Sequence, residues 1–383
     1  MRFTVDAHAI GQKLTGNETY VSNLLRCFTS LDRESEFIAY ISRPSAENRI
    51  PSRVQVRLVS ENPFRRLGFD LPRRLRQDSP DLIHVQYTAP LFSGRTPVVV
   101  SVHDVSFLSH PQYFTSFRRK QLRLTVQRTV RRAAKILTPS EFSRRCILDA
   151  YNLDESKVAV MPIAASPQFR PVAKPVAAAA ARERIGIDGP FVMTVGDLQP
   201  RKNHLGLIRA FEDAMRAHPE LPHQLLLVGK DTWYSPVIHQ AAAKSPLANR
   251  IRFTGFVSDA DLVTLYSACD LFVFPSFYEG FGLPILEAMA CGRAVACSNS
   301  SAIPEVADSA ALLFDPESTS EMTRAMLDLL LDSGLRTHME RLALARAAQF
   351  SWERTARETL EVYYEVAAKG TRVPAPARQI ARI

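Results

Sequence analysis

Short runs of β-branched and aromatic residues alternate with amphipathic stretches along most of the chain. Apolar runs of about four to eight residues bounded by turn residues are typical of strands buried on both faces. In the first half they predict strands at 2–7, 36–41, 54–59, 81–86, 97–104, 134–140 and 157–162. Amphipathic spacing predicts helices between several of these strands, at 17–30, 114–132 and 141–149.

The alternation stops between residues 164 and 190, where several prolines and an alanine run occur. This composition predicts a linker with a short helix near 177–185. The alternation then restarts, with strands predicted at 191–197, 224–230, 251–257, 271–276, 294–299 and 311–316. The helices predicted in this half lie at 203–217, 235–243, 259–267, 284–291, 318–332, 335–348 and, with Ser351 as a candidate N-cap, 352–367.

Strands that alternate with helices predict parallel sheets covered on both faces. A length of 383 residues favours two domains. We therefore expect an α/β protein with two Rossmann-like, doubly wound domains that face a central cleft, where ligands bind at the carboxyl ends of the strands. The expected domains are 1–168 and 191–350, with a linker at 169–190. The segment 351–383 is expected to cross back to the first domain as a helix and to end in a loosely held tail after Gly370.

Composition narrows the class of protein. Hydrophobic residues make up 46% of the chain and charged residues 23%, which is typical of a soluble globular protein. No apolar run approaches the roughly 20 residues that span a bilayer, and the first ten residues lack the apolar core of a secretory signal. Five scattered cysteines without a CxxC pair argue against a zinc site or a disulfide framework and favour a reducing compartment. A cytoplasmic protein is expected.

The positive charge is concentrated in the first half of the chain. Residues 1–165 hold 25 Lys and Arg against 15 Asp and Glu, so they carry all of the net charge of +9. Much of it lies in 65–76 and 118–132. Such a patch attracts anionic membranes, nucleic acids or acidic substrates, and a merely solvated helix face is the structural alternative. Nucleic acid is disfavoured because no zinc-finger, RNP-like or heptad pattern accompanies the charge. Peripheral binding at the inner face of the plasma membrane is one interpretation of the patch, and a solvated helix face stays the alternative.

The stretch 275–306 carries the most chemical information. A strand is expected to end in a glycine-bearing turn, and Pro284 suits the first position of the helix that follows. Gly280 and Gly282 would let the backbone approach a ligand closely and adopt positive φ. The amides that then point from the helix start, a favourable site for a diphosphate, belong to Phe281, Gly282 and Leu283.

Two carboxylates flank this turn. Glu279 precedes the helix, and Glu287 is expected in its first turn. One carboxylate can accept hydrogen bonds from two vicinal hydroxyls, which suits a ribose for one of them and a sugar ring for the other. The alternative is that Glu287 only complements the helix dipole and Glu279 only caps a turn.

A second stretch, 195–211, also leads from a strand through a glycine into a helix. Gly196 is followed by a loop that bears Arg201 and Lys202, and the helix is expected from about Asn203. Two cations beside a helix start would neutralise a diphosphate leaving group. Adjacent basic residues in a loop are more often only solvent-exposed, so the interpretation depends on their occurrence together with the glutamate stretch.

Together, EGFGLPILEAMACGRAVACSNSSAIPEV (279–306) and VGDLQPRKN (195–203) resemble the family 4 retaining glycosyltransferases, which have the GT-B fold. The resemblance covers nearly the whole chain, because it extends to TGNETYVSNLL (15–25), VHDVSFLSHPQYF (102–114) and TPSEFSRRCI (138–147). It implies transfer of a hexose from a nucleotide diphosphate sugar to a glycan or lipid-linked acceptor, without a metal or other cofactor. The first domain would bind the acceptor and the second the nucleotide sugar.

The resemblance also implies roles for single residues. Arg201 and Lys202 match the diphosphate-binding pair, Glu279 the contact to donor-sugar hydroxyls, and Glu287 the contact to the ribose. His103 matches a histidine at the cleft, Val257 the contact to the base, and Gly16 an N-terminal glycine loop near donor or acceptor. The implied catalytic set is His103, Arg201, Lys202 and Glu279. The implied donor-binding set is Gly16, Gly196, Arg201, Lys202, Val257, Phe281, Gly282, Leu283 and Glu287.

Some details of the sequence limit the comparison. Some members of the family carry arginine where this chain has Asp197, which weakens inference of the donor from them. The PRKN form resembles mannosyltransferases of O-antigen and surface polysaccharides, so GDP-mannose is the leading donor. Asp259 and Asp261 mimic a metal-binding DxD motif, but they open a helix, where capping by Ser258 or Asp259 is the expected role. No metal site is assigned.

Other functions were weighed against transfer. No carboxylate pair suits hydrolysis, no nucleophile elbow occurs, and Gly11 and Gly16 do not form the GxGxxG of a nicotinamide site. The enzyme alternatives are a sugar-nucleotide epimerase and a phosphorylase of the same architecture. A non-catalytic nucleotide-binding module is the remaining alternative.

Overall fold

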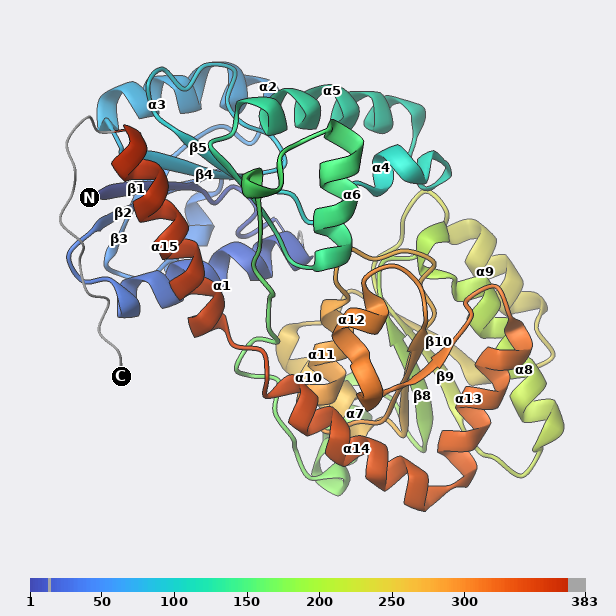
Figure 1. The fold of residues 1–383 in the computed structure, drawn as a ribbon. Helices are drawn as coiled ribbons and strands as arrows, with labels where there is room; N and C mark the ends of the chain where they lie inside the picture. Colours follow the sequence, from blue (N-terminus) through green and yellow to red (C-terminus); the bar gives the residue numbers. More distant parts are fainter. Residues whose placement is uncertain (13–14, 371–383) are drawn as a thin grey trace.

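The computed structural model describes residues 1–12 and 15–370, which form two parallel sheets with helices on both faces (Figure 1). The first sheet has seven strands in the order β3-β2-β1-β4-β5-β6-β7. Its strands are β1 (Arg2–Asp6), β2 (Glu36–Ile41), β3 (Val54–Leu58), β4 (Leu82–Gln86), β5 (Val98–Ser101), β6 (Lys135–Thr138) and β7 (Val158–Val160).

The second sheet has six strands in the order β10-β9-β8-β11-β12-β13. They are β8 (Phe191–Val195), β9 (Gln224–Val228), β10 (Ile251–Gly255), β11 (Leu271–Phe274), β12 (Val295–Ser298) and β13 (Leu312–Phe314). In both sheets the order reverses at the first strand, which is the doubly wound topology. The predicted fold class is therefore confirmed, and each predicted strand is present.

The helices of the first half are α1 (Thr15–Leu31), α2 (Pro63–Arg65), α3 (Leu71–Asp78), α4 (Ser106–Ser109), α5 (Ser116–Arg132) and α6 (Glu141–Tyr151). A π-helical turn, Arg66–Asp70, joins α2 to α3. The helical segment from Pro63 to Asp78 is not among the elements predicted from the sequence. Only Leu71 and Leu75 of α3 are buried, so its apolar pattern is too short to show a helical period.

The second half contains α7 (Lys174–Ile185), α8 (His204–Ala217), α9 (Ser235–Lys244), α10 (Asp259–Ala268), α11 (Leu283–Ala290), α12 (Ile303–Ala307), α13 (Thr319–Leu331), α14 (Ser333–Ala347) and α15 (Trp352–Gly370). Ser258 caps α10 by accepting from the amide of Asp261 at 3.2 Å. The Asp261 carboxylate pairs with Arg184, and that of Asp259 accepts from Gln168 at 2.8 Å. Both aspartates thus have structural partners.

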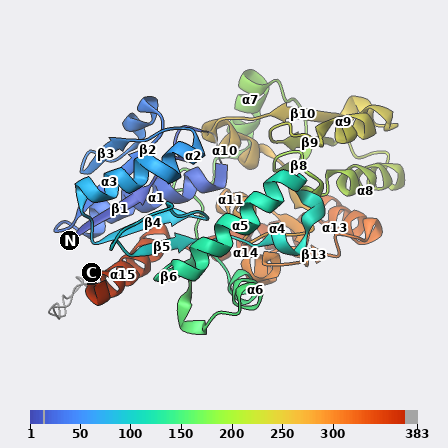
Figure 2. The ribbon, with the colours of Figure 1, turned by 90° about the horizontal axis from the view of Figure 1, so that it is seen from above.

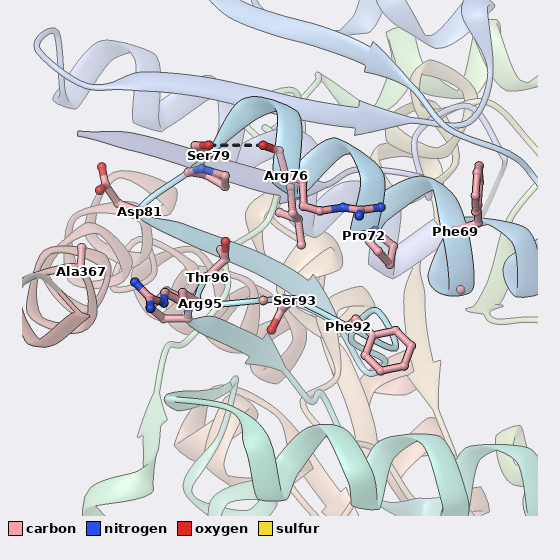
Figure 3. A pocket seen from close by; sticks show the side chains of 15 residues that line it. Phe69, Pro72, Arg76, Ser79, Asp81, Phe92, Ser93, Arg95, Thr96 and Ala367 are labelled. Carbon is pink, nitrogen blue, oxygen red and sulfur yellow. Dashed lines mark hydrogen bonds between the residues drawn. The ribbon is translucent and has the colours of Figure 1, made fainter.

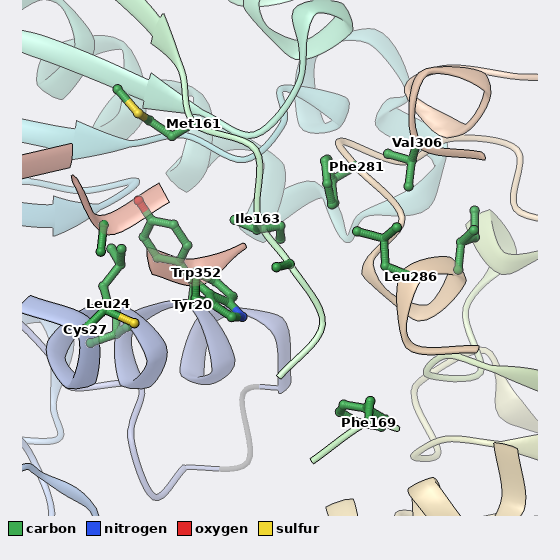
Figure 4. Close-up of a cluster of buried hydrophobic side chains, with 14 of the residues drawn as sticks. Tyr20, Leu24, Cys27, Met161, Ile163, Phe169, Phe281, Leu286, Val306 and Trp352 are labelled. Atoms are coloured by element: carbon green, nitrogen blue, oxygen red, sulfur yellow. The ribbon is translucent and has the colours of Figure 1, made fainter. Parts of the chain in front are cut away.

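Helix α15 returns to the first half and lies beside α1 (Figure 1). Its Tyr363 packs edge-on against Phe3 of β1, with ring centroids 5.2 Å apart. Near Trp352 one buried cluster continues through Ile163 to Phe281 of the second half (Figure 4). The two halves therefore share apolar packing. The tail predicted after Gly370 lies outside the described residues.

Candidate active site

Three loops meet at the carboxyl ends of β8, β9 and β10. The amide of Gly196 donates to Val228 O at 2.8 Å, and that of Gly229 donates to Gly255 O at 3.1 Å. A Cβ on Gly229 would lie 2.0 Å from Gly196 O, so only glycine allows this approach. Val257, half-buried, follows two residues after β10. The loop predicted to contact the base thus follows β10, which is separated by β9 from β8, the strand that leads to the cationic pair.

Arg201 and Lys202 lie in a single 3-10 turn before α8 and face Glu279. The Arg201 guanidinium is 2.6 Å from Glu279 Oε2, and the Lys202 ammonium is 2.7 Å from Glu279 Oε1. A Cβ on Gly196 would lie 2.9 Å from the Lys202 stem, so the glycine makes room for that side chain. The structure therefore brings the three residues together in a cluster with one excess positive charge.

Backbone bonds join the two segments that carry this cluster. Arg201 donates from its guanidinium to Tyr278 O at 2.6 Å and accepts at its carbonyl from the amide of Phe277 at 2.9 Å. The amide of Glu279 donates to Ser301 Oγ at 2.8 Å. The positions of the cations relative to the glutamate are thus fixed through main-chain atoms as well as through charge.

The cluster is buried, and its charges shift each other's titration. Burial alone would raise the pKa of Glu279, but the charges and hydrogen bonds of Arg201 and Lys202 lower that pKa to about 2. Burial lowers the pKa of Lys202, and Glu279 opposes this shift. Burial also acts against the charged form of Arg201, but Glu279 and Asp104 raise its pKa above the usual value. The net shifts of Glu279 and Arg201 both favour the charged forms of these two groups.

The glycine-bearing turn approaches the first half of the chain, which corrects one expectation. The sequence predicts positive φ at Gly280, but Gly280 has no positive φ, and a Cβ there would lie 2.2 Å from His103 O. Gly280 is thus required by contact with the other sheet's loop. Gly282 does adopt positive φ, at 108°, and precedes α11. The amides at a helix start lack intrahelical partners, so those of Gly282 and Leu283 stay candidate donors to a ligand, while Phe281 lies one residue before the N-cap.

Glu287 lies in the second turn of α11, not in the first as expected, because the helix begins at Leu283. The helix-dipole alternative loses its basis, since that effect is confined to the first turn. Tyr266 donates from its hydroxyl to Glu287 Oε2 at 3.1 Å. Burial raises the pKa of Glu287 to about 7, although the Tyr266 hydrogen bond opposes this. A buried carboxylate with this pKa gains from a ligand hydroxyl that donates to its charged form.

His103 follows β5, and its carbonyl oxygen lies against Gly280, the residue after Glu279. Its Nε2 is 3.1 Å from Gln86 Oε1, and the Gln86 amide nitrogen donates to Asn17 O at 3.2 Å. Burial lowers the pKa of His103 to about 4, while Asp104 opposes this, so the imidazole is neutral at pH 7. Gly16 precedes Asn17 at the exposed start of α1. Residues 13–14 of its predicted loop lie outside the described residues.

The sequence analysis missed the contacts that join the two halves at this point. Ser140 and Ser143 both donate from their hydroxyls to Gly280 O, at 2.7 and 3.0 Å. The Glu305 carboxylate accepts from the first amides of α6, those of Glu141 at 2.8 Å and Phe142 at 3.1 Å. In the sequence, Ser140 and Glu305 stand only within segments that resemble the family. Pairing across more than a hundred residues leaves no local pattern that could have shown it.

A cavity of about 640 Å³ lies away from this cluster, between α3 and residues 92–97 (Figure 3). It is lined by residues that directly precede β4 and β5, so it opens at the amino ends of these strands. The predicted site lies at the carboxyl ends. The cavity therefore belongs to a different surface.

Two doubly wound sheets, with a buried Arg201–Lys202–Glu279 cluster where a turn of the second half meets the first and with Glu287 buried in the helix that follows, have the architecture of a GT-B glycosyltransferase. A solved structure with this arrangement, that of Anabaena Alr3699/HepE in complex with UDP-glucose, matches with a TM-score of 0.76 and 21% identity, over 95% of this chain and 99% of the other. That match shows the fold.

Residues 178–346 match the family model "Glycosyl transferases group 1", and residues 14–168 match "Glycosyltransferase Family 4". The O-antigen chain mannosyltransferase B of Escherichia coli is 34% identical over 266 residues, 69% of each chain. The serotype-specific mannosyltransferase WbdA of Escherichia coli is 34% identical over 182 residues, 47% of this chain but only 22% of that protein. The chain belongs to the group 1, family 4 glycosyltransferases, as its motifs predicted.

Proposed function

We propose that this glycosyltransferase transfers mannose from GDP-mannose to a hydroxyl group of a glycan or lipid-linked acceptor, with retention of configuration and without a metal ion. The observation that carries the proposal is the buried cluster of Arg201, Lys202 and Glu279 beside the start of α11 and the loop of His103. Mannose is favoured because the Escherichia coli relatives are named mannosyltransferases and because of the PRKN sequence.

The cluster has the charges that departure of a diphosphate needs. Arg201, Lys202 and the first amides of α11 would hold the two phosphates, and the cations would stabilise the negative charge that develops as the C1–O bond breaks. Two protein cations can take the place of a divalent metal in this role. As the phosphates share the cations, Glu279 becomes free to accept hydrogen bonds from hydroxyls of the sugar.

Retention requires attack on the face that the diphosphate leaves. The acceptor hydroxyl forms the new bond to C1 from that face, and the leaving phosphate oxygen takes its proton. Neutral His103, whose carbonyl oxygen lies against Gly280, would contact the sugar and the acceptor. Glu287 would hold the ribose, and Val257 would pack against the base.

Donor and mechanism are tested together with a panel of GDP, UDP and ADP sugars. Thermal shift selects the sugar nucleotide that binds, because a ligand of the folded state raises apparent stability. The anomeric configuration of the product is then read by NMR, with and without a chelator. Preference for a UDP sugar would refute the donor, and inversion at C1 would refute retention. Loss of turnover on chelation would refute the metal-independent mechanism. Donor consumption without an acceptor would favour an epimerase.

The acceptor and the place of action follow from the same proposal. None of the helices within residues 1–12 and 15–370 is long and apolar enough to cross a membrane. We infer a cytoplasmic enzyme that reaches a lipid-linked acceptor by binding to the inner face of the plasma membrane. The basic first half supplies the attraction.

A further inference from the structure

Helices α2, α3 and α5 lie along one side of the first half, away from the second half (Figure 1), and Figure 2 looks down on them. The segment 88–97 joins them into one surface. Its Leu91 amide donates to Leu67 O at 2.9 Å, and the Arg128 guanidinium of α5 donates to Leu91 O. We call the surface formed by 62–78, 88–97 and 115–132 the basic–aromatic face.

Large apolar side chains point into solvent from this face. Four of the five exposed phenylalanines among the described residues lie on it, each 57 to 74% exposed. They are Phe64, Phe69, Phe92 and Phe117, and Leu91 and Leu124 accompany them. An exposed apolar patch rimmed by charge marks a surface that binds a partner.

Helix α5 shows how the face is built. Phe117 and Leu124 are seven residues apart and so project from the same side of the helix, opposite the buried Val126 and Val130. The helix carries seven Lys and Arg and no acidic residue within Ser116–Arg132. A basic helix with exposed Phe and Leu is typical of a segment that lies in the interface of an anionic membrane.

The 640 Å³ cavity opens on the same face (Figure 3). Arg76 and Arg95 line it, and Phe69 and Phe92 lie toward one end. Asp81, which also lines it, accepts from the backbone amide of Arg2 at 2.8 Å. Two arginines beside a hollow can bind a phosphate group, because the guanidinium matches phosphate geometry.

We propose that the basic–aromatic face docks on an anionic phospholipid bilayer. The phenylalanines enter the acyl boundary, the arginines of α3 and α5 pair with lipid phosphates, and the cavity between α3 and 92–97 receives a headgroup. This deepens the proposed function, because it names the surface that meets a membrane-bound acceptor. It leaves the second half free to bind nucleotide sugar from water.

Charge and chemistry favour a membrane over other partners. A second copy that docked through this face would bring two acid-free α5 helices together, and like charges oppose such contact. Nucleic acid binds exposed aromatic rings by stacking, but Leu91 and Leu124 offer no ring. Phenylalanine and leucine side chains both fit the acyl boundary of a bilayer.

The test is co-sedimentation of the full chain with vesicles of phosphatidylcholine, with or without phosphatidylglycerol. We expect binding only to the anionic vesicles, weakening as salt screens the charges. Phe64→Ser with Phe117→Ser should abolish it, and Arg118→Gln and Arg123→Gln should each weaken it about fivefold. The matched controls are the exposed Leu331→Ser of α13 and Arg216→Gln of α8, which should bind normally.

Equal binding to neutral vesicles, unchanged binding by the phenylalanine pair, or RNA binding in place of vesicle binding would overturn the proposal. Turnover with a soluble acceptor separates docking from catalysis. The face variants should keep it, since the face lies apart from the Glu279 cluster. A protein that docks but transfers no sugar would refute the proposed function and leave docking intact.

Discussion

Lys202→Met removes the charge of the cationic pair while keeping most of the side-chain stem. The stem passes Gly196, and the ammonium lies 4.8 Å from the centroid of the Phe274 ring, so an apolar replacement fits the space. Loss of one preorganised group that stabilises developing charge costs about 10²–10³ in kcat, or about 3–4 kcal/mol. We expect a decrease of this size at saturating donor.

The effect on stability should be smaller, because Glu279 keeps Arg201 as a partner at 2.6 Å. The loss of one charged hydrogen bond costs about 1.5–3 kcal/mol. Lys174→Met is the matched control. It removes the ion pair of Lys174 with Asp270. Burial would raise the pKa of Asp270, but His223 and Lys174 lower it to about 2, so this carboxylate resembles Glu279.

The assay compares kcat and the free energy of unfolding for the two variants. Both should lose stability, and only Lys202→Met should lose turnover. If kcat of Lys202→Met stays within a few-fold of the parent value, or falls no further than that of Lys174→Met, the assigned role of Lys202 is wrong. A parallel loss of both quantities in both variants would show that the cluster only supports the fold.

Three further predictions follow from the site. The pKa of Glu287 is raised from its ordinary value of 4.5 to about 7. The folded state therefore loses stability as pH rises from 4.5 to 7, by about 3 kcal/mol at most, because ionisation of this buried group disfavours folding. Glu287→Gln should therefore melt higher than the parent at pH 8 but not at pH 4, and should raise the donor KM; equal melting shifts at both pH values would contradict this. Gly280→Ala should lower kcat, since its Cβ would meet His103 O at 2.2 Å and push the halves apart; unchanged small-angle scattering and kcat would count against it. Glu305→Ala should lower the unfolding free energy by about 1 kcal/mol, as for loss of a helix cap, and no change in thermal melting would exclude the contact with α6.

Strands and caps were predictable because their causes are local. The residues of β4 and β11 are all buried, so each strand appears as a short apolar run between turns. Ser258 was one of two candidate caps of the helix at 259–267, and it accepts the expected bond from the amide of Asp261. Pairing of Arg201 with Lys202 near Glu279 was expected from two separate strand-to-helix turns and from family resemblance.

The sequence did not predict the exact ends of elements or the contacts between elements that lie far apart in the chain. The start of α11 at Leu283 moves Glu287 from the first turn to the second, and a boundary shift of this size is within the uncertainty of local patterns. The π-helical turn at Arg66–Asp70 has no local pattern of its own. The contact of Gly280 with His103 requires both sheets to be in place, and no property of either segment alone shows it.

The bonds around Gly280 link the cluster of Arg201, Lys202 and Glu279 to the first half of the chain. Gly280 O accepts from two hydroxyls of the first half, and the next residue back, Glu279, holds both cations. Separation of the halves would break these bonds and also expose the first amides of α6 that Glu305 satisfies. Because Glu279 and Gly280 are consecutive, any such opening must move the cationic cluster away from His103. The same turn therefore positions the two cations and sets their distance from His103 of the first half.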